Sequence, residues 1–274
     1  MILQMRATHV VLAAFIVGCS GGYKSPTVTA PPSPPPPLKP AKWELVWADE
    51  FDGATLDTSK WIPVNGASNV NNERQYYAPA NAYLESGALV LRSDARSMGG
   101  RGYTSGEVRT GTKRTVGAGN AVEWRTQIPT GKGIWPANWL VNTPCDGING
   151  CGGSWPPEID VMEIRGSAPN INLMTHWWGT YPAQQHQTTE LSGVTLTPGY
   201  HTYRIEWYAD SIIWYVDSTQ RAKHTSNITN GDLQLVMNTA VGGDFDGNPD
   251  STTTFPQYHR VEYVRVYRDT ANFH

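Results

Sequence analysis

Hydrophobic and polar residues alternate in short runs along most of the chain, beginning near residue 43. Alternation with a period of two is typical of a β-strand with one buried face, and Gly, Asn and Asp residues separate the runs as turns would. We identify no long run with the spacing of an amphipathic helix. Many short strands in about 230 residues predict an all-β domain of two packed antiparallel sheets, a sandwich or jelly roll. The predicted strands are 45–51, 88–93, 106–109, 121–128, 172–177, 201–207, 211–216, 233–239 and 260–268.

One further strand pattern carries three acids, Glu158, Asp160 and Glu163, within six residues. Side chains alternate between the two faces of a strand, so Glu158 and Asp160 share a face. Strict alternation sends Glu163 to the apolar face, where an unpaired carboxylate is costly. One extra residue near Val161-Met162, a β-bulge, returns Glu163 to the face of the other two. The sequence therefore predicts a row of three acids on one strand.

Such a row suits hydrolysis of a glycosidic bond, which uses one ionised and one protonated carboxyl group. A separation of about 5–5.5 Å gives retention of configuration, and wider spacing gives inversion. Same-face neighbours on a strand lie about 6–7 Å apart, which favours the retaining geometry. Crowding pushes the pKa values apart and keeps one acid protonated. The alternative is a solvated acidic strand face, but the preceding Trp155-Pro-Pro and the closing Gly166 favour a catalytic strand.

The stretch Glu158-Ile-Asp-Val-Met-Glu163 resembles the E-x-D-x-x-E signature of glycoside hydrolase family 16 in its bulged form. The resemblance implies that Glu158 is the nucleophile, that Glu163 is the general acid/base, and that Asp160 tunes their protonation. It extends from about residue 43 to residue 267. It also implies a β-jelly-roll sandwich with a concave substrate cleft across one sheet, and it requires no cofactor for catalysis.

Two other segments resemble sugar-binding parts of that family. Asn69-Val-Asn-Asn-Glu-Arg-Gln-Tyr-Tyr77 is similar to a stretch of laminarinase-type members in which Asn and Arg meet sugars, which points to Asn72 and Arg74. Gly131-Lys-Gly-Ile-Trp-Pro-Ala-Asn-Trp-Leu140 is similar to the G-x-W-P-A-x-W segment, which places Trp135 and Trp139 on the walls of the cleft. A hydrogen-bonded polar loop and a pair of core tryptophans are the structural alternatives.

The segment His176-Trp177-Trp178 lies on the strand expected beside the acidic one. We expect His176 to hydrogen-bond Asp160 or a sugar hydroxyl, and we place Trp177 with it among the substrate-binding residues. A structural role for His176 is the alternative.

Many bacterial members of the family carry a structural calcium ion bound by an early acid, a glycine carbonyl and a late Asp. The matching positions here are Glu50, Gly87 and Glu262, with Glu where Asp is usual. The resemblance thus implies a structural calcium site that departs from the usual ligand set.

The N-terminus is expected to be an export signal followed by a linker. Residues 1–18 contain a short apolar run and end before Cys19, which resembles the lipidated cysteine of bacterial lipoproteins. Residues 19–42 are rich in proline and form an extended linker, which leaves 43–274 as the catalytic domain. We therefore expect an exported protein, lipid-anchored to the bacterial outer membrane or cell surface; an ordinary secreted protein is the alternative.

Charge and cysteine content narrow the picture further. The net charge of −3 comes with no basic cluster, which argues against nucleic acid as a partner. Eleven Trp and thirteen Tyr against five Phe favour partly wet grooves where rings stack on sugars. In an exported protein Cys145 and Cys151 are expected to form a disulfide, and a zinc site is less favoured because no His lies nearby.

We therefore predict a monomeric, membrane-tethered, retaining endo-glycosidase that acts on β-1,3-glucan of the laminarin type or on mixed β-1,3-1,4-glucan. One alternative is an agarase or carrageenase of the same fold. Others are a glucan transglycosylase, which shares all three acids, and a non-catalytic glucan-binding protein, whose family relatives lack the catalytic Glu residues.

Overall fold

The computed structural model describes residues 42–145, 148–151 and 154–271. The predicted signal peptide, Cys19 and nearly all of the proline-rich linker lie outside this part, so these assignments stay predictions. Within the described residues, no helix has the length and apolar character needed to cross a membrane.

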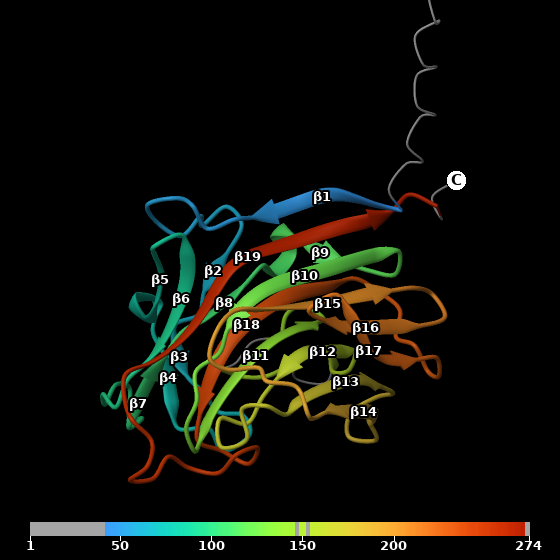
Figure 1. Cartoon of the computed structure of the whole chain (residues 1–274). Coiled ribbons are helices and arrows are strands. Elements are labelled where there is room, and N and C mark those ends of the chain that lie inside the picture. The colour runs from blue at the N-terminus through green and yellow to red at the C-terminus, as the bar shows by residue number, and fades with distance from the viewer. Residues whose placement is uncertain (1–41, 146–147, 152–153, 272–274) are drawn as a thin grey trace, which may run out of the picture. The chain divides into compact units, whose positions relative to one another are not determined.

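The described chain is built almost entirely of strands, arranged in two large sheets and one small one (Figure 1). The first sheet has the order β17-β16-β15-β10-β19-β6-β5, with β1 added on β19. Its strands are β1 (Trp43–Asp49), β5 (Ala82–Glu85), β6 (Ala88–Ser93), β10 (Asn120–Gln127), β15 (His201–Trp207), β16 (Ile212–Val216), β17 (Thr219–His224) and β19 (Gln257–Asp269).

The second sheet has the order β14-β13-β12-β11-β18-β8-β2, with β9 added on β18. A three-stranded sheet, β3-β4-β7, and two short 3₁₀ helices, η1 (Pro79–Asn81) and η2 (Gly111–Lys113), complete the fold. The strands concerned are β2 (Ile62–Pro63), β3 (Gly66–Ala67), β4 (Gln75–Tyr77), β7 (Tyr103–Ser105), β8 (Glu107–Arg109), β9 (Thr115–Val116), β11 (Ile134–Val141), β12 (Glu158–Glu163), β13 (Asn172–Trp178), β14 (Gln185–Leu191) and β18 (Leu233–Val241).

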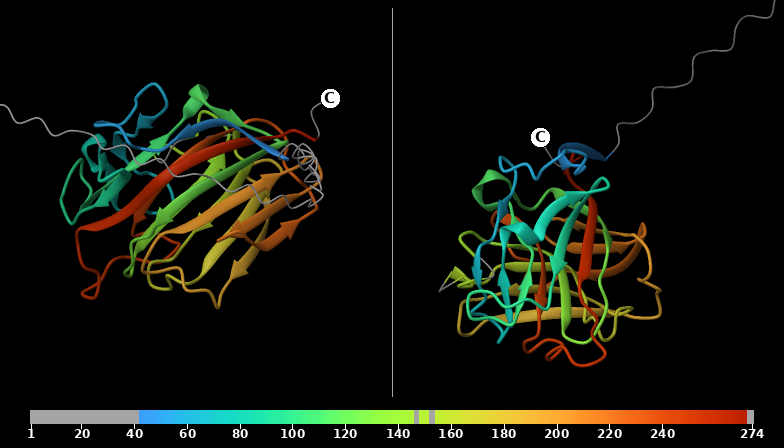
Figure 2. Two further views of the ribbon diagram at one scale, coloured as in Figure 1. Left: turned by 45° about the horizontal axis from the view of Figure 1, so that its top comes forward. Right: turned by 90° about the vertical axis from the view of Figure 1, so that its left-hand side faces the viewer.

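The two large sheets pack face to face (Figure 2). Apolar side chains from both sheets form one buried core. Trp124 of β10 and Trp207 of β15 enter this core from the first sheet. Ile159 of β12 and Met237 of β18 enter it from the second. All pairings within the two large sheets are antiparallel. The predicted all-β sandwich of jelly-roll type is confirmed.

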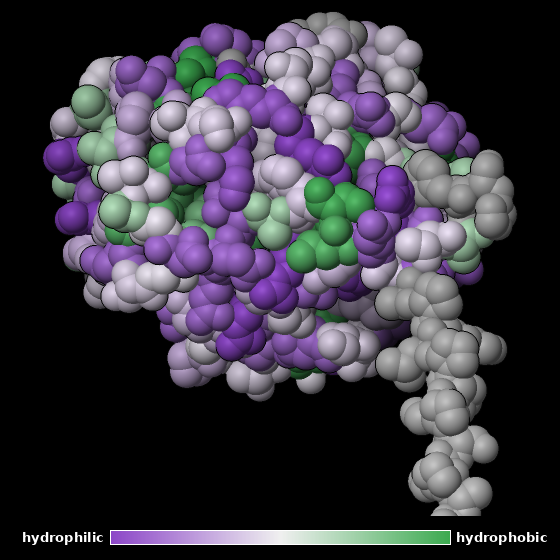
Figure 3. All heavy atoms as spheres, turned by 90° about the horizontal axis from the view of Figure 1, so that it is seen from above, coloured by the Kyte–Doolittle hydropathy of each residue, from purple (hydrophilic) through white to green (hydrophobic). Residues whose placement is uncertain are grey.

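The outer faces of the two sheets differ in composition. The side of the first sheet that carries β1 and β19 is largely polar, with small apolar patches (Figure 3). On β19, alternation leaves Arg260 and Arg265 partly exposed while Val261, Val264 and Val266 are buried. The outer face of the second sheet instead carries the three predicted acids.

Candidate active site

The acids Glu158, Asp160 and Glu163 all lie on β12, near the middle of the second sheet. Opposite them on β11, Asp160 pairs with Trp139 and Glu163 with Ala137. The register shifts between Asn138 and Trp139, so the pairing passes over Val161. Ala137 and Trp139 are two residues apart and so share a face of β11. Their partners Glu163 and Asp160 therefore share a face of β12.

The intervening apolar side chains of β12 point the other way. Ile159, Val161 and Met162 are buried in the core between the sheets. Glu158 and Glu163 keep partial exposure, whereas Asp160 is only 5% exposed. The strand therefore presents a row of three carboxyl groups on its outer face, while the buried side chains of its inner face hold its backbone in place.

Each acid accepts a hydrogen bond from a different tryptophan. Trp155 Nε1–H donates to Glu158 at 2.9 Å, Trp177 Nε1–H to Asp160 at 3.1 Å, and Trp135 Nε1–H to Glu163 at 3.2 Å. Indole N–H groups only donate, so each holds one oxygen of its carboxyl group in place. The indoles also supply broad apolar walls beside the carboxyl groups.

Burial raises the pKa of each acid in the row above its usual range. The pKa of Glu158 is well above that range because of burial and of the nearby charges on Asp160 and Glu163. Burial raises the pKa of Asp160 to about 7, against the opposing effect of the Trp177 N–H. The pKa of Glu163 is also well above its usual range, through burial and the charge of Asp160. The row therefore retains protons at neutral pH and can donate one.

An aromatic stack extends the row at the Glu163 end. Trp135 lies on the ring of Phe245 with centroids 4.4 Å apart and an interplanar angle of 22°. The Arg165 guanidinium covers the same Phe245 ring at 4.6 Å and donates through Nε to the Phe245 carbonyl at 2.9 Å. The charge of Arg165 also lowers the pKa of Glu163, in opposition to burial.

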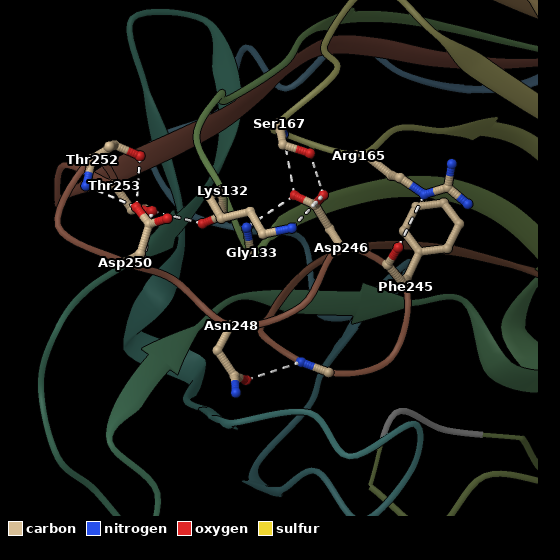
Figure 4. A network of polar contacts seen from close by, with 11 residues as sticks. Lys132, Gly133, Arg165, Ser167, Phe245, Asp246, Asn248, Asp250, Thr252 and Thr253 are labelled. Atoms are coloured by element: carbon tan, nitrogen blue, oxygen red, sulfur yellow. Dashed lines mark hydrogen bonds and ion pairs between the residues drawn. The ribbon is translucent and has the colours of Figure 1, made fainter.

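The loop that carries Phe245 is fixed by the buried carboxylate of Asp246 (Figure 4). It accepts the backbone N–H of Gly133 at 2.9 Å and that of Ser167 at 3.1 Å, as well as the Ser167 hydroxyl. Lys132 Nζ lies 3.6 Å from the same group. One side chain thus ties this loop to the start of β11 and to the segment that follows β12.

The predicted residues Asn72 and Arg74 meet the same loop from the other side. Asn72 Nδ2 donates to both oxygens of Asp244 at 3.0 Å, and the Arg74 backbone N–H donates to the Val241 carbonyl at 2.8 Å. Both side chains are exposed. The structure therefore brings them next to the loop that carries Phe245, beyond the Trp135 end of the row.

The predicted disulfide between Cys145 and Cys151 is present. It packs with Trp139 and Trp155 in a small apolar cluster on the outer face of the second sheet. Trp139, which pairs with Asp160 across the strands, donates its Nε1–H to Asn238 Oδ1 at 2.9 Å, so its N–H binds an amide and not one of the three acids. The disulfide loop thus supports the indole that binds Glu158.

The assignment of His176 to substrate binding is wrong. Its ring is fully buried on the core side of β13, where it pairs with Ile159. Adjacent residues of a strand face opposite ways, so Trp177 points outward and makes the contact to Asp160 that we predicted for His176.

The residues Glu50, Gly87 and Glu262 do not fit a calcium site as placed. Arg265 forms a two-pronged ion pair with Glu50 at 2.8 Å, and Arg125 pairs with Glu262. Each carboxylate is already neutralised by a different arginine, and a metal would have to displace both. Within the described residues, no cluster of three or more His, Cys, Asp or Glu side chains is arranged to hold a metal ion.

Sequence reasoning missed several contributors to the site. Trp155 lies three residues before Glu158 and Arg165 two after Glu163, so their proximity along the chain was an available signal. Phe245 and Asp246 come from a distant loop, and no local pattern connects them to the acids. Trp214 of β16, whose Nε1–H donates to the Asp160 carbonyl at 2.9 Å, reaches the row from the other sheet.

Comparison with known proteins agrees with this geometry. Residues 65–264 match the model of the glycosyl hydrolases family 16. The chain is 33% identical over 267 residues to the glucan endo-1,3-beta-glucosidase A1 of Niallia circulans, covering 84% of this chain and 38% of that protein. It is 32% identical over 290 residues to a beta-glucanase of Rhodothermus marinus, covering 97% and 95%.

Among solved structures, the chain is similar to the catalytic domain of an endo-1,3-beta-glucanase (laminarinase) from Thermotoga petrophila. The TM-score is 0.74 at 31% identity, and the match covers 83% of this chain and 98% of that domain. The chain thus spans less than half of the first relative but nearly all of the second and of this domain.

Proposed function

The chain belongs to the glycosyl hydrolases of family 16, and on that premise we propose that it is a retaining endo-glycosidase of β-1,3-glucan. The observation that carries the proposal is the row of three acids on β12, each bound by its own indole N–H on the outer face of the second sheet. The Niallia and Thermotoga relatives, an endo-1,3-beta-glucosidase and a laminarinase, support the linkage. Mixed β-1,3-1,4-glucan is the second candidate.

In the first step Glu163, protonated, gives its proton to the oxygen of the scissile bond as Glu158 attacks the anomeric carbon. The bond to the leaving sugar breaks, and a glycosyl ester forms on Glu158. Glu163 then takes a proton from water, whose oxygen attacks the anomeric carbon and releases Glu158. Both carboxyl groups thereby return to their starting protonation states.

Asp160 lies between the two and interacts with both. Its carboxyl group shares a hydrogen bond with Glu158, and its charge raises the pKa of Glu163. While Asp160 is ionised, its charge favours the protonated form of both glutamates. Burial raises the pKa of Asp160 to about 7, so its carboxyl group can take up the shared proton when Glu158 must ionise to attack. This transfer leaves an ionised Glu158 beside a protonated Glu163.

The test of this proposal is reducing-sugar release from laminarin, lichenan, agarose and carrageenan in parallel, with proton NMR of the first product formed. We expect laminarin to be cleaved and the new reducing end to appear first as the β-anomer. An α-anomer would overturn the retaining mechanism, and release from agarose or carrageenan alone would overturn the substrate. Products longer than the starting chain would identify a transglycosylase; binding of laminarin without cleavage of any polysaccharide would identify a binding protein.

Replacing Trp177 with phenylalanine is expected to move the acidic limb of the kcat/KM profile to higher pH by about one unit. The indole N–H favours the ionised form of Asp160, so its loss raises the pKa of the coupled row. A hydrogen bond to a charged group contributes about 1.5 kcal/mol, which is about one pKa unit. The matched control is Trp139→Phe, whose lost N–H binds Asn238 instead. Equal profiles for the two variants would contradict the proposed role of Trp177.

A further inference from the structure

Two buried histidines link the two sheets directly behind the acidic row. His176 comes from β13 of the second sheet and His224 from β17 of the first, and their side chains are 0% and 1% exposed. Their Nδ1 atoms lie 2.9 Å apart, within hydrogen-bond distance. Polar contacts of this kind are costly in an apolar core unless every group has a partner.

The neighbours of the pair allow one arrangement of protons. His176 Nε2 lies 3.1 Å from the Ser226 carbonyl, which only accepts, so this nitrogen carries the hydrogen. The Nδ1 atom of neutral His176 must then accept, and His224 Nδ1 must donate to it. His224 Nε2 in turn accepts from the Thr189 hydroxyl at 2.9 Å. Burial lowers the pKa of both rings, that of His224 to about 4, so both are neutral at neutral pH.

The pair adjoins both contacts that hold Asp160 in place. His224 packs against the Trp214 ring at 4.6 Å, and the Trp214 Nε1–H donates to the Asp160 backbone carbonyl. His176 precedes Trp177, whose Nε1–H donates to the Asp160 carboxylate. His224 thus supports the Trp214 indole, which binds the backbone of Asp160. His176 lies on the same strand as Trp177, which binds the Asp160 side chain.

We propose that the hydrogen bond between His176 and His224, defined here as the histidine bridge, is a positioning device for Asp160. It sets the separation of β13 from the first sheet and so holds Trp177 and Trp214 at hydrogen-bond distance from the two ends of this residue. The inference rests on the proposed function, because it assigns the bridge to the chemistry of the acidic row. It touches no surface that a sugar reaches, so its loss acts on kcat rather than on KM.

The test compares His224→Leu with His224→Asn. Leucine fills the space but donates nothing, whereas the asparagine amide can place an N–H where Nδ1 stood. We expect the leucine variant to lose about 10- to 100-fold in kcat on laminarin, because a misplacement of about 1 Å in the reacting groups can cost about 100-fold, with KM within about twofold. We expect asparagine to restore most of the loss. The control is Val266→Ala, a core truncation that destabilises the fold without contacting Asp160.

A leucine variant with wild-type kcat and a lower Tm, like the control, would overturn the proposal and make the bridge structural only. Equal losses in the leucine and asparagine variants would overturn it too. The ¹⁵N signals of the imidazole rings in the wild type give a readout independent of activity. They are expected to show a hydrogen on His224 Nδ1 and on His176 Nε2, and any other pattern overturns the bridge. Failure of the wild type on every glucan would refute the proposed function while leaving this result intact.

Discussion

Replacing Glu158 with alanine is expected to lower kcat on laminarin by at least about 10⁴-fold, with little change in KM. In the proposed mechanism the change removes the atom that forms the glycosyl ester, and no neighbour can take its place because Asp160 is 5% exposed and held by Trp177. Reducing-sugar release under saturating laminarin measures the loss. The change leaves the aromatic walls that we propose bind the sugar, which is why we expect KM to change little.

Added azide distinguishes a lost nucleophile from a damaged site. In Glu158→Ala the small anion can enter from the face that Glu158 occupied and displace the leaving sugar in a single step, so the product is the α-glycosyl azide. The matched control is Glu190→Ala, which removes an exposed carboxylate from β14 and is expected to retain full activity. A β-glycosyl azide from Glu158→Ala, or an activity close to that of wild type, would reassign the nucleophile.

Local alternation located most strands of the two large sheets, but it missed the central strand β11 and strands at the edges. The predicted bounds 88–93 and 201–207 match β6 and β15 residue for residue, because each strand buries a hydrophobic set on at least one face. The edge strands β14 and β17, with sequences QHQTTEL and TQRAKH, were not predicted. Edge strands have less apolar surface to bury, so their sequences carry little of the alternation that identifies a strand.

Within the site, the sequence predicted the residues that lie close together in the chain but not those that come from distant segments. The three acids lie within six residues, so strand geometry alone placed them in one row. The partners from elsewhere, such as Phe245 and Trp214, depend on which segments the fold brings together, which a single sequence does not state. The error at His176 has a simpler cause: alternation shows that His176 and Trp177 face opposite ways, but only the register against β12 decides which of them meets Asp160.

Replacing Glu163 with alanine is expected to separate substrates by their leaving groups. Hydrolysis of laminarin needs a proton on a poor leaving oxygen, so kcat should fall by about 10²–10⁴-fold. The second substrate is an aryl β-glucan oligosaccharide with an acidic phenol as its leaving group. This phenol leaves as phenolate without a proton from Glu163, so formation of the glycosyl ester should be almost unimpaired. Stopped-flow release of the phenol should then show a burst followed by slow turnover, because no base remains to activate water. Equal losses on both substrates would remove Glu163 from the acid/base role.

The Glu163→Ala variant also tests which limb of the pH–activity profile depends on Glu163. Burial holds the pKa of Glu163 above its usual range, so the wild-type enzyme has its proton donor at low pH and loses activity as the pH rises through that value. In Glu163→Ala this alkaline limb should disappear, while the acidic limb, set by ionisation of Glu158 and Asp160, should remain. Azide should attack the ester on Glu158 from the opposite face and give the β-glycosyl azide, the reverse of the product from Glu158→Ala. The same anomer from both variants would mean that the two carboxyl groups do not act on opposite faces of the sugar.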